Sequence, residues 1–97
     1  MKTFKVKIQN SEGLHARPAS QLVSLCHRFE SNITLTFADM EADGKNITEA
    51  LGLGAEKDDE LIIRAEGKDE SEVKEALKKL FTANAPETEK VQEYGDH

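Results

Sequence analysis

The sequence contains a single cysteine, two prolines and no long apolar run among its 97 residues. One cysteine, Cys26, excludes an internal disulfide, so the fold must depend on its hydrophobic core, and this suits a reducing compartment. The apolar runs are only a few residues long, whereas a membrane-spanning helix needs about 20. The start, MKTFKVKIQN, lacks the apolar block of a signal peptide. These absences predict a cytoplasmic protein that does not insert into a membrane.

Basic residues are also scarce in this chain. It has 13 Lys and Arg against 19 Asp and Glu, which gives a formal net charge of -6 at pH 7. A basic face supplies most of the affinity of a general nucleic-acid-binding protein. We therefore expect no nucleic-acid partner, and we expect partner proteins whose docking surface is basic or apolar.

The length and composition fit one small domain. With 37% hydrophobic and 33% charged residues, the chain is near the size at which a single core can still hold a fold together. The sequence contains no internal repeat and no linker. We predict a single domain over residues 1–86, followed by a polar C-terminal tail over residues 87–97 that is expected to be disordered.

Apolar residues that alternate with polar ones predict the strands. This period of two occurs in TFKVKIQ (residues 3–9), NITLTF (residues 32–37) and ELIIRAE (residues 60–66). A further short strand is predicted near residues 41–43, after the turn ADM. Each of the three longer strands would bury one face and leave the other in water.

Apolar residues at helical spacing predict three helices. The first extends from Pro18 to about Phe29, the second covers NITEALG, and the third follows Asp69 and ends at Pro86. Asn46 is a favoured N-cap, and Glu49 three positions later resembles the acidic partner of a capping box. Asp69 is predicted to cap the third helix. The resulting order predicts an α+β fold with helices on one face of a mostly antiparallel sheet, with the strand order left open.

The segment SEGLHARPAS places a histidine directly before the first predicted helix. A helix N-terminus presents unpaired N–H groups and the positive end of the helix dipole, and both favour a bound anion. Gly13 permits a sharp turn, and Pro18 fits a first turn because its missing N–H has no intrahelical partner there. The imidazole of His15 can accept a phosphoryl group near neutral pH, and Arg17 can neutralise and orient that group.

The histidines and the cysteine also have ordinary structural interpretations. A lone histidine before a helix is more often an exposed capping residue, so the chemistry alone leaves this alternative open. His27 and His97 are predicted to be surface residues, and Cys26, at an apolar helical position, is predicted to be a packing residue. We expect neither a metal nor a cofactor, because phosphoryl acceptance needs none and few carboxylates lie nearby in the sequence.

The run GLHARPAS resembles the active-site signature of the histidine-containing phosphocarrier protein (HPr) family of the bacterial sugar phosphotransferase system. The similarity continues without a gap through FES.I.L after the first helix, GK before the second, LGLG after it and AEGKDE before the last helix. It covers about Lys2 to Leu80.

The resemblance implies an HPr-like open-faced β-sandwich of order βαββαβα, in which three helices cover one face of a four-stranded antiparallel sheet. It implies that His15 accepts, through Nδ1, a phosphoryl group from enzyme I that originates in phosphoenolpyruvate, and passes it to an EIIA-type domain. Arg17 would stabilise the group in transit, while Ala16, Arg17 and Ser20 would bind its oxygens. The protein would be a carrier more than an enzyme, and we expect a monomer.

Residues around the acceptor are candidates for a docking rim. They flank the site or occupy the exposed side of the second helix, and they are Leu14, Ile47 and Leu51, with Ala16 and Ser20 as further members.

Several positions depart from the family pattern. Asn46 stands where Gram-positive members carry a regulatory serine, so it keeps the helix cap and cannot be phosphorylated. Thr48 and Glu49 replace a more apolar docking patch, which predicts weaker affinity for a standard partner. Glu12 replaces a small polar residue, and its carboxylate would repel a nearby phosphoryl group unless it points away.

Two other functions remain open from the sequence. The first is an HPr-like regulatory protein that docks a transcription factor or an enzyme with little phosphotransfer, which the altered second helix favours. The second is a small-ligand-binding domain of ferredoxin-like composition, for which the GLHARPA run would be a coincidence.

Overall fold

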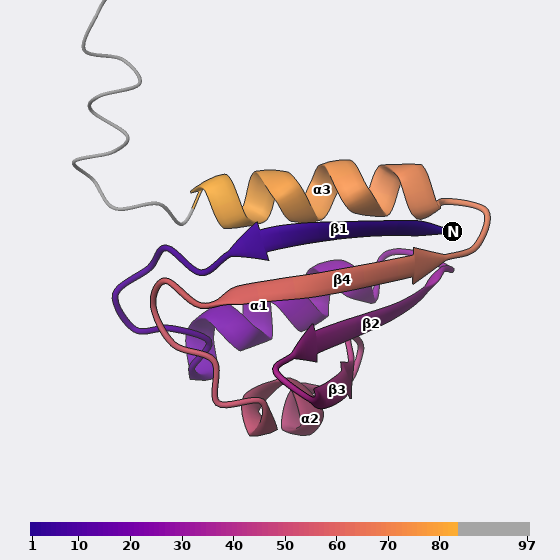
Figure 1. The fold of residues 1–97 in the computed structure, drawn as a ribbon. Helices are drawn as coiled ribbons and strands as arrows, with labels where there is room; N and C mark the ends of the chain where they lie inside the picture. Colours follow the sequence, from indigo (N-terminus) through magenta and orange to yellow (C-terminus); the bar gives the residue numbers. More distant parts are fainter. Residues whose placement is uncertain (84–97) are drawn as a thin grey trace, which may run out of the picture.

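A computed structural model of the protein describes residues 1–83, in which strands and helices alternate in the predicted βαββαβα order (Figure 1). The first half contains β1 (Lys2–Lys7), α1 (Ala16–Cys26), β2 (Asn32–Phe37) and β3 (Met40–Asp43). The second half contains α2 (Ile47–Gly52), β4 (Glu60–Glu66) and α3 (Glu70–Ala83). Three predictions fall outside the described residues: the end of the third helix at Pro86, the tail at 87–97 and the surface position of His97.

The four strands form one antiparallel sheet in the order β1-β4-β2-β3. The strand β4 lies between β1 and β2, and β3 pairs with β2 as a hairpin at the edge. The central position suits β4 because its segment, ELIIRAE, is rich in residues that favour strands and alternates without a break. The register pairs Phe4 with Ile63, Ile63 with Leu35, and Leu35 with Ala42.

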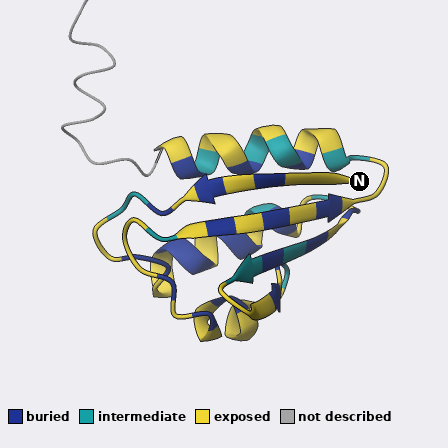
Figure 2. Cartoon of the chain, viewed as in Figure 1, coloured by how far each residue is buried: buried dark blue, intermediate teal, exposed yellow. Residues whose placement is uncertain are grey.

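That register gathers the buried residues on one face of the sheet, which the helices cover (Figure 2). Leu35, Leu61 and Ile63 are fully buried there, and burial of each such side chain contributes roughly 1.5–3 kcal/mol. The opposite face carries Arg64, the half-buried Thr34 and the exposed Ile62. The predicted open-faced sandwich, with helices on one side only, is therefore confirmed.

Two predicted boundaries shift by two residues. The strand β1 ends at Lys7, but Ile8 is still buried, and its N–H and C=O bond to Asp59 and Asp58 at 2.9 and 2.7 Å. Helix α1 begins at Ala16, so Pro18 is its third residue. A proline is tolerated there because the first hydrogen bond of the helix comes from the next amide along the chain.

The predicted cap by Asn46 is confirmed, whereas the capping box at Glu49 and the side-chain cap by Asp69 are wrong. The Asn46 side chain does accept from the Glu49 N–H at 3.0 Å, as predicted, but the Glu49 carboxylate accepts from the Asp43 N–H at 2.8 Å and closes no capping box. The carboxylate of Asp69 binds the loop between α1 and β2 through Glu30 N–H, at 2.8 Å, and through the N–H and hydroxyl of Ser31. These contacts link the start of α3 to the end of α1.

Cys26 is fully buried on α1, as the packing prediction requires. Burial raises the pKa of its thiol to about 12, so the thiolate form is scarce at neutral pH. Among residues 1–83, no helix is long and apolar enough to cross a membrane.

Candidate functional site

His15 is the N-cap residue of α1, with an extended backbone at φ -90° and ψ -166°. Its carbonyl accepts the first helical hydrogen bond, from Ala19 N–H at 2.8 Å, but its side chain makes no capping hydrogen bond. The imidazole is 61% exposed. His15 therefore occupies the N-cap position through its backbone, while its imidazole is left open to solvent.

The helix directly after His15 offers backbone donors for an anion. The N–H groups of Ala16 and Arg17 precede the first residue that can bond within the helix, and Pro18 has no N–H. Both residues are exposed. An anionic group attached to the imidazole would therefore lie near two unpaired amides at the positive end of the helix dipole.

The loop before His15 is held in place by backbone contacts. Gly13 has φ +71°, a region that glycine occupies without strain, and its N–H bonds Asn10 C=O at 3.1 Å. The Asn10 side chain returns a bond to Gly13 C=O at 2.9 Å. Leu14 N–H then bonds Ala55 C=O at 2.9 Å, which ties the loop to the segment after α2. These bonds fix the position of His15 relative to α2.

A shallow hollow of about 200 Å³ lies beside His15 and is lined by Leu14, Ala16, Leu51 and Gly54 as well. The docking-rim prediction needs one correction here, because Leu14 is only 4% exposed and packs in the core. It forms the floor of the hollow and offers little surface to a partner.

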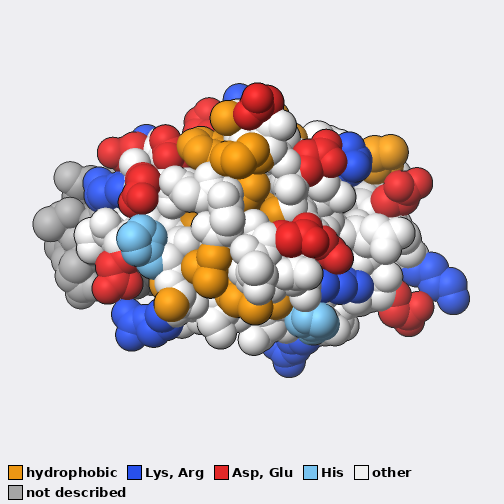
Figure 3. Space-filling view, turned by 90° about the horizontal axis from the view of Figure 1, so that it is seen from below, with side chains coloured by type: hydrophobic (Ala, Val, Ile, Leu, Met, Phe, Trp, Pro, Cys, Tyr) orange, Lys and Arg blue, Asp and Glu red, His pale blue; other side chains and the backbone are white. Residues whose placement is uncertain are grey.

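Helix α2 carries the exposed part of this apolar surface. Ile47 and Leu51 are 37% and 40% exposed, as the prediction of a rim on the outer side of the helix requires. Seen from below, the molecule gathers hydrophobic side chains near the middle of this face, with acidic and basic side chains around them (Figure 3). Such a surface suits a partner with an apolar centre and a charged edge.

Arg17 is two residues after His15, but the two side chains border different hollows. Arg17 lines one of about 180 Å³ with Glu12 and Gln21, and no hydrogen bond or ion pair between Arg17 and His15 occurs in residues 1–83. Ser20 is exposed and lies in the second turn of α1.

The structure adds Glu56, which the sequence analysis did not single out. Both carboxylate oxygens of Glu56 lie 3.4 Å from Nε2 of His15. The two residues are 41 positions apart, and Glu56 belongs to an acidic turn with no motif of its own, so no local pattern could have indicated this contact.

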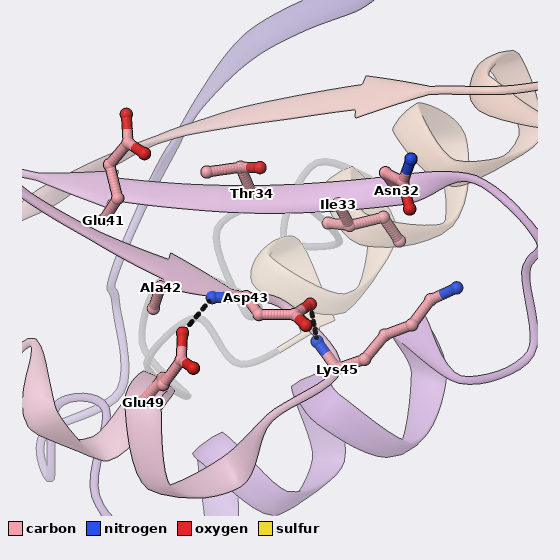
Figure 4. Close-up of a pocket in the computed structure, with 8 residues that line it drawn as sticks. All are labelled: Asn32, Ile33, Thr34, Glu41, Ala42, Asp43, Lys45 and Glu49. Carbon is pink, nitrogen blue, oxygen red and sulfur yellow. Dashed lines mark hydrogen bonds between the residues drawn. The ribbon is translucent and has the colours of Figure 1, made fainter.

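A larger hollow lies away from His15, between β2, β3 and α2, with a volume of about 410 Å³ (Figure 4). Its polar groups bond mainly to one another: Asp43 accepts from Lys45 N–H at 2.9 Å, and Glu49 accepts from Asp43 N–H. The Lys45 ammonium donates to Phe29 C=O at 2.8 Å. The Glu49 bond joins α2 to the β2–β3 hairpin and the Lys45 bond joins the turn before α2 to the loop after α1, so we assign the hollow a structural role. Within residues 1–83, no group of three or more His, Cys, Asp or Glu side chains could hold a metal ion.

Comparison with known proteins identifies relatives along most of the chain. A family model described as the PTS HPr component phosphorylation site matches residues 2–83. A phosphocarrier protein HPr of Mycoplasma genitalium is 36% identical over 85 residues, which cover 87% of this chain and 97% of the relative.

Two solved structures show the same similarity in three dimensions. HPr-C-His from Thermoanaerobacter tengcongensis has a TM-score of 0.84 and 33% identity, covering 87% of this chain and 94% of that one. Crh, a catabolite repression protein of Bacillus subtilis, has a TM-score of 0.69 and 29% identity, covering 90% and 100%. Its crystal structure is a dimer with a swapped domain.

Proposed function

Since the chain belongs to the HPr family of phosphocarrier proteins of the phosphotransferase system, we propose that His15 accepts a phosphoryl group from enzyme I and passes it to an EIIA-type component. The observation that carries this proposal is the exposed imidazole at the N-cap of α1, which makes no capping bond. In this role the protein works in the cytoplasm as a carrier for sugar uptake, and it needs no cofactor.

The residues around His15 each have a part in this proposal. The N–H groups of Ala16 and Arg17 receive the phosphoryl oxygens, and the Arg17 guanidinium turns in from its neighbouring hollow to neutralise the group as it moves. Because the site is open, a partner can reach the phosphorus atom without any rearrangement of the fold. Ser20 remains a candidate donor from the second turn.

The apolar surface of Ile47 and Leu51 beside His15 is the proposed docking site for both partners. Glu49 lies between them in the sequence, and its carboxylate accepts a hydrogen bond from the Asp43 N–H of the hairpin. The carboxylate therefore contributes less to the docking surface than the sequence predicted. Asn46 uses its side chain as the helix cap and offers no hydroxyl for a serine kinase.

One experiment tests the carrier role directly. The purified protein is incubated with phosphoenolpyruvate and an enzyme I, and its intact mass is measured before and after mild acid. We expect one added phosphate that acid removes and alkali spares, as a phosphohistidine behaves. The variant His15→Ala should gain none while keeping the melting temperature of the parent, since the imidazole is exposed and makes no bond on which the fold depends.

Two outcomes would reject the proposal. A folded His15→Ala variant that still gains phosphate would place the acceptor elsewhere. His27→Ala serves as the matched control, because His27 is also an exposed histidine at an end of α1, its C-cap. No addition to the parent protein with several sources of enzyme I would favour the second candidate function.

That second candidate is a regulatory protein that docks a transcription factor or an enzyme with little phosphotransfer. The similarity to Crh, a catabolite repression protein, favours it, as does Thr48 on the second helix. Because Crh forms a swapped dimer, the expected monomer should be tested by light scattering coupled to size-exclusion chromatography.

A further inference from the structure

We propose that Glu56 is a positioning residue for His15: its carboxylate accepts the Nε2–H of the imidazole and so directs the free lone pair to Nδ1. This inference rests on the proposed function, because it concerns how the same histidine carries a phosphoryl group. It adds a residue that lies outside the GLHARPAS segment.

The geometry places the carboxylate on one edge of the ring. Both Glu56 oxygens lie 3.4 Å from Nε2, and an ionised carboxylate can only accept a hydrogen bond. A neutral imidazole carries one proton, so the nitrogen that faces the carboxylate is the one that holds it. The lone pair is then on Nδ1, at a different corner of the ring from the carboxylate.

The backbone of Glu56 is fixed against the loop that carries His15. Gly13 packs so closely there that an added Cβ would lie 2.9 Å from Glu56 Cα and 2.9 Å from Glu56 Oε1. The Glu56 N–H donates to the Asp59 carboxylate at 2.8 Å, and Asp59 N–H returns a bond to Glu56 C=O at 3.0 Å. Together with the bond from Leu14 N–H to Ala55 C=O, these contacts hold Glu56 beside the imidazole.

The chemistry of phosphoryl transfer explains why this arrangement matters. During acceptance the Nδ1 lone pair attacks phosphorus while the bond to the donor nitrogen breaks, and the ring becomes cationic with its proton still on Nε2. A carboxylate next to that proton stabilises the cation. During delivery the bond from phosphorus to Nδ1 breaks and its electron pair returns to the ring, which leaves as a neutral imidazole. No proton has to move in either step.

Removal of the Nε2 proton from the phosphorylated ring would make delivery of the phosphoryl group harder. The ring would then have to leave as an imidazolate anion, which is a poor leaving group, and phosphoryl delivery would slow. Glu56 therefore favours the form of the phosphorylated ring that can pass its group on. Because both side chains are more than half exposed, we expect a modest effect, about two- to fivefold on the rate.

The first test measures the tautomer of His15 without any phosphate. Long-range ¹H–¹⁵N correlation spectra of the parent protein, Glu56→Gln and Glu56→Ala are recorded at a pH of about 8.5, where an ordinary imidazole is neutral. The fraction of the ring protonated at Nε2 should be highest in the parent and lowest in Glu56→Ala. Glu60→Gln is the matched control, since it removes an exposed carboxylate that pairs with Lys5 instead, and it should match the parent.

The second test measures lability of the phosphorylated ring. The same proteins are phosphorylated chemically with phosphoramidate, which needs no enzyme I, and the loss of phosphate is followed by intact mass. Phospho-His15 should persist about two- to fivefold longer in Glu56→Gln than in the parent or in Glu60→Gln.

These outcomes separate the inference from the proposed function. Equal tautomer fractions in all three proteins, with backbone spectra that show an intact fold, would overturn the role of Glu56 even if enzyme I phosphorylates His15. Equal lifetimes of the phosphorylated ring would overturn it as well. A tautomer shift in a protein that no enzyme I phosphorylates would instead contradict the carrier function and leave the contact between Glu56 and His15 standing.

Discussion

Ala38 occupies a backbone conformation that residues other than glycine rarely adopt. It has φ +57° in the two-residue turn between β2 and β3, where Phe37 pairs with Met40. A Cβ in this region meets the backbone and costs roughly 1–2 kcal/mol, whereas glycine avoids that clash but loses more chain entropy on folding. The turn itself was predicted at ADM, but nothing in an alanine indicates a positive φ. The hairpin imposes this angle.

We therefore predict that Ala38→Gly stabilises the protein by about 0.5–1 kcal/mol, the difference between those two effects. Urea denaturation at neutral pH would measure the free energy of unfolding. Ala76→Gly, the same chemical change inside α3, is the control and should destabilise by about 1 kcal/mol. A loss of stability at both positions would mean that Ala38 is unstrained.

At the scale of elements, α2 depends on its first cap. The helix has only six residues, and Asn46 satisfies one of its free amides by accepting from Glu49 N–H at 3.0 Å. Short helices are marginal without such contacts. The sequence was sufficient to predict this cap, since asparagine before an apolar pattern at helical spacing is a local signal. The Glu49 bond to the hairpin was not predictable, because it depends on how α2 packs against β3.

Replacing Asn46 by alanine should lower the free energy of unfolding by about 1 kcal/mol. Asn46→Ser keeps an oxygen acceptor at the same position and should cost only a few tenths of that amount. Thermal or urea unfolding of the two variants gives the comparison. If both changes cost the same, the cap contributes nothing, and the packing of α2 against β3 alone holds the helix.

At the scale of the whole molecule, Asp69 joins segments that lie far apart in the sequence. The Ser31 hydroxyl, followed by the Glu30 N–H, holds the pKa of the Asp69 carboxyl below its ordinary value of 3.8. The chain N-terminus and Gly67 N–H likewise hold the pKa of Glu70 below its ordinary value of 4.5. A carboxyl whose pKa is lower in the folded state stabilises the fold when the pH is above its pKa in the unfolded chain. That stabilisation is lost as the pH falls through the pKa in the folded state.

The protein should therefore lose stability progressively as the pH falls below about 4.5, because the unfolded chain binds more protons there. The variant Asp69→Asn should have a lower free energy of unfolding than the parent at pH 7, and its free energy of unfolding should fall less steeply with decreasing pH. Urea denaturation between pH 7 and pH 3 would measure both. Asp39→Asn, an exposed carboxylate at the other end of β2, should follow the parent curve. An unchanged acid slope in Asp69→Asn would show that its hydrogen bonds do not couple to folding.

Local patterns by themselves determined the seven elements and the position of His15 at the start of a helix. Alternation and helical spacing are properties of neighbouring residues, and the GLHARPAS segment contains the proposed acceptor His15, the amides at the start of α1 and Arg17 in one continuous run. Those features could be predicted because each depends on residues within about one turn of each other.

Only the tertiary structure decided which distant groups meet. The placement of β4 between β1 and β2, the bonds from Asp69 to Ser31, and the approach of Glu56 to His15 all join residues dozens of positions apart. Leu14 turned inward for the same reason, since the loop that positions His15 is bonded to Ala55 and must fill the space beneath it. Such contacts follow from how the helices pack on the sheet, and no short segment of sequence contains that information.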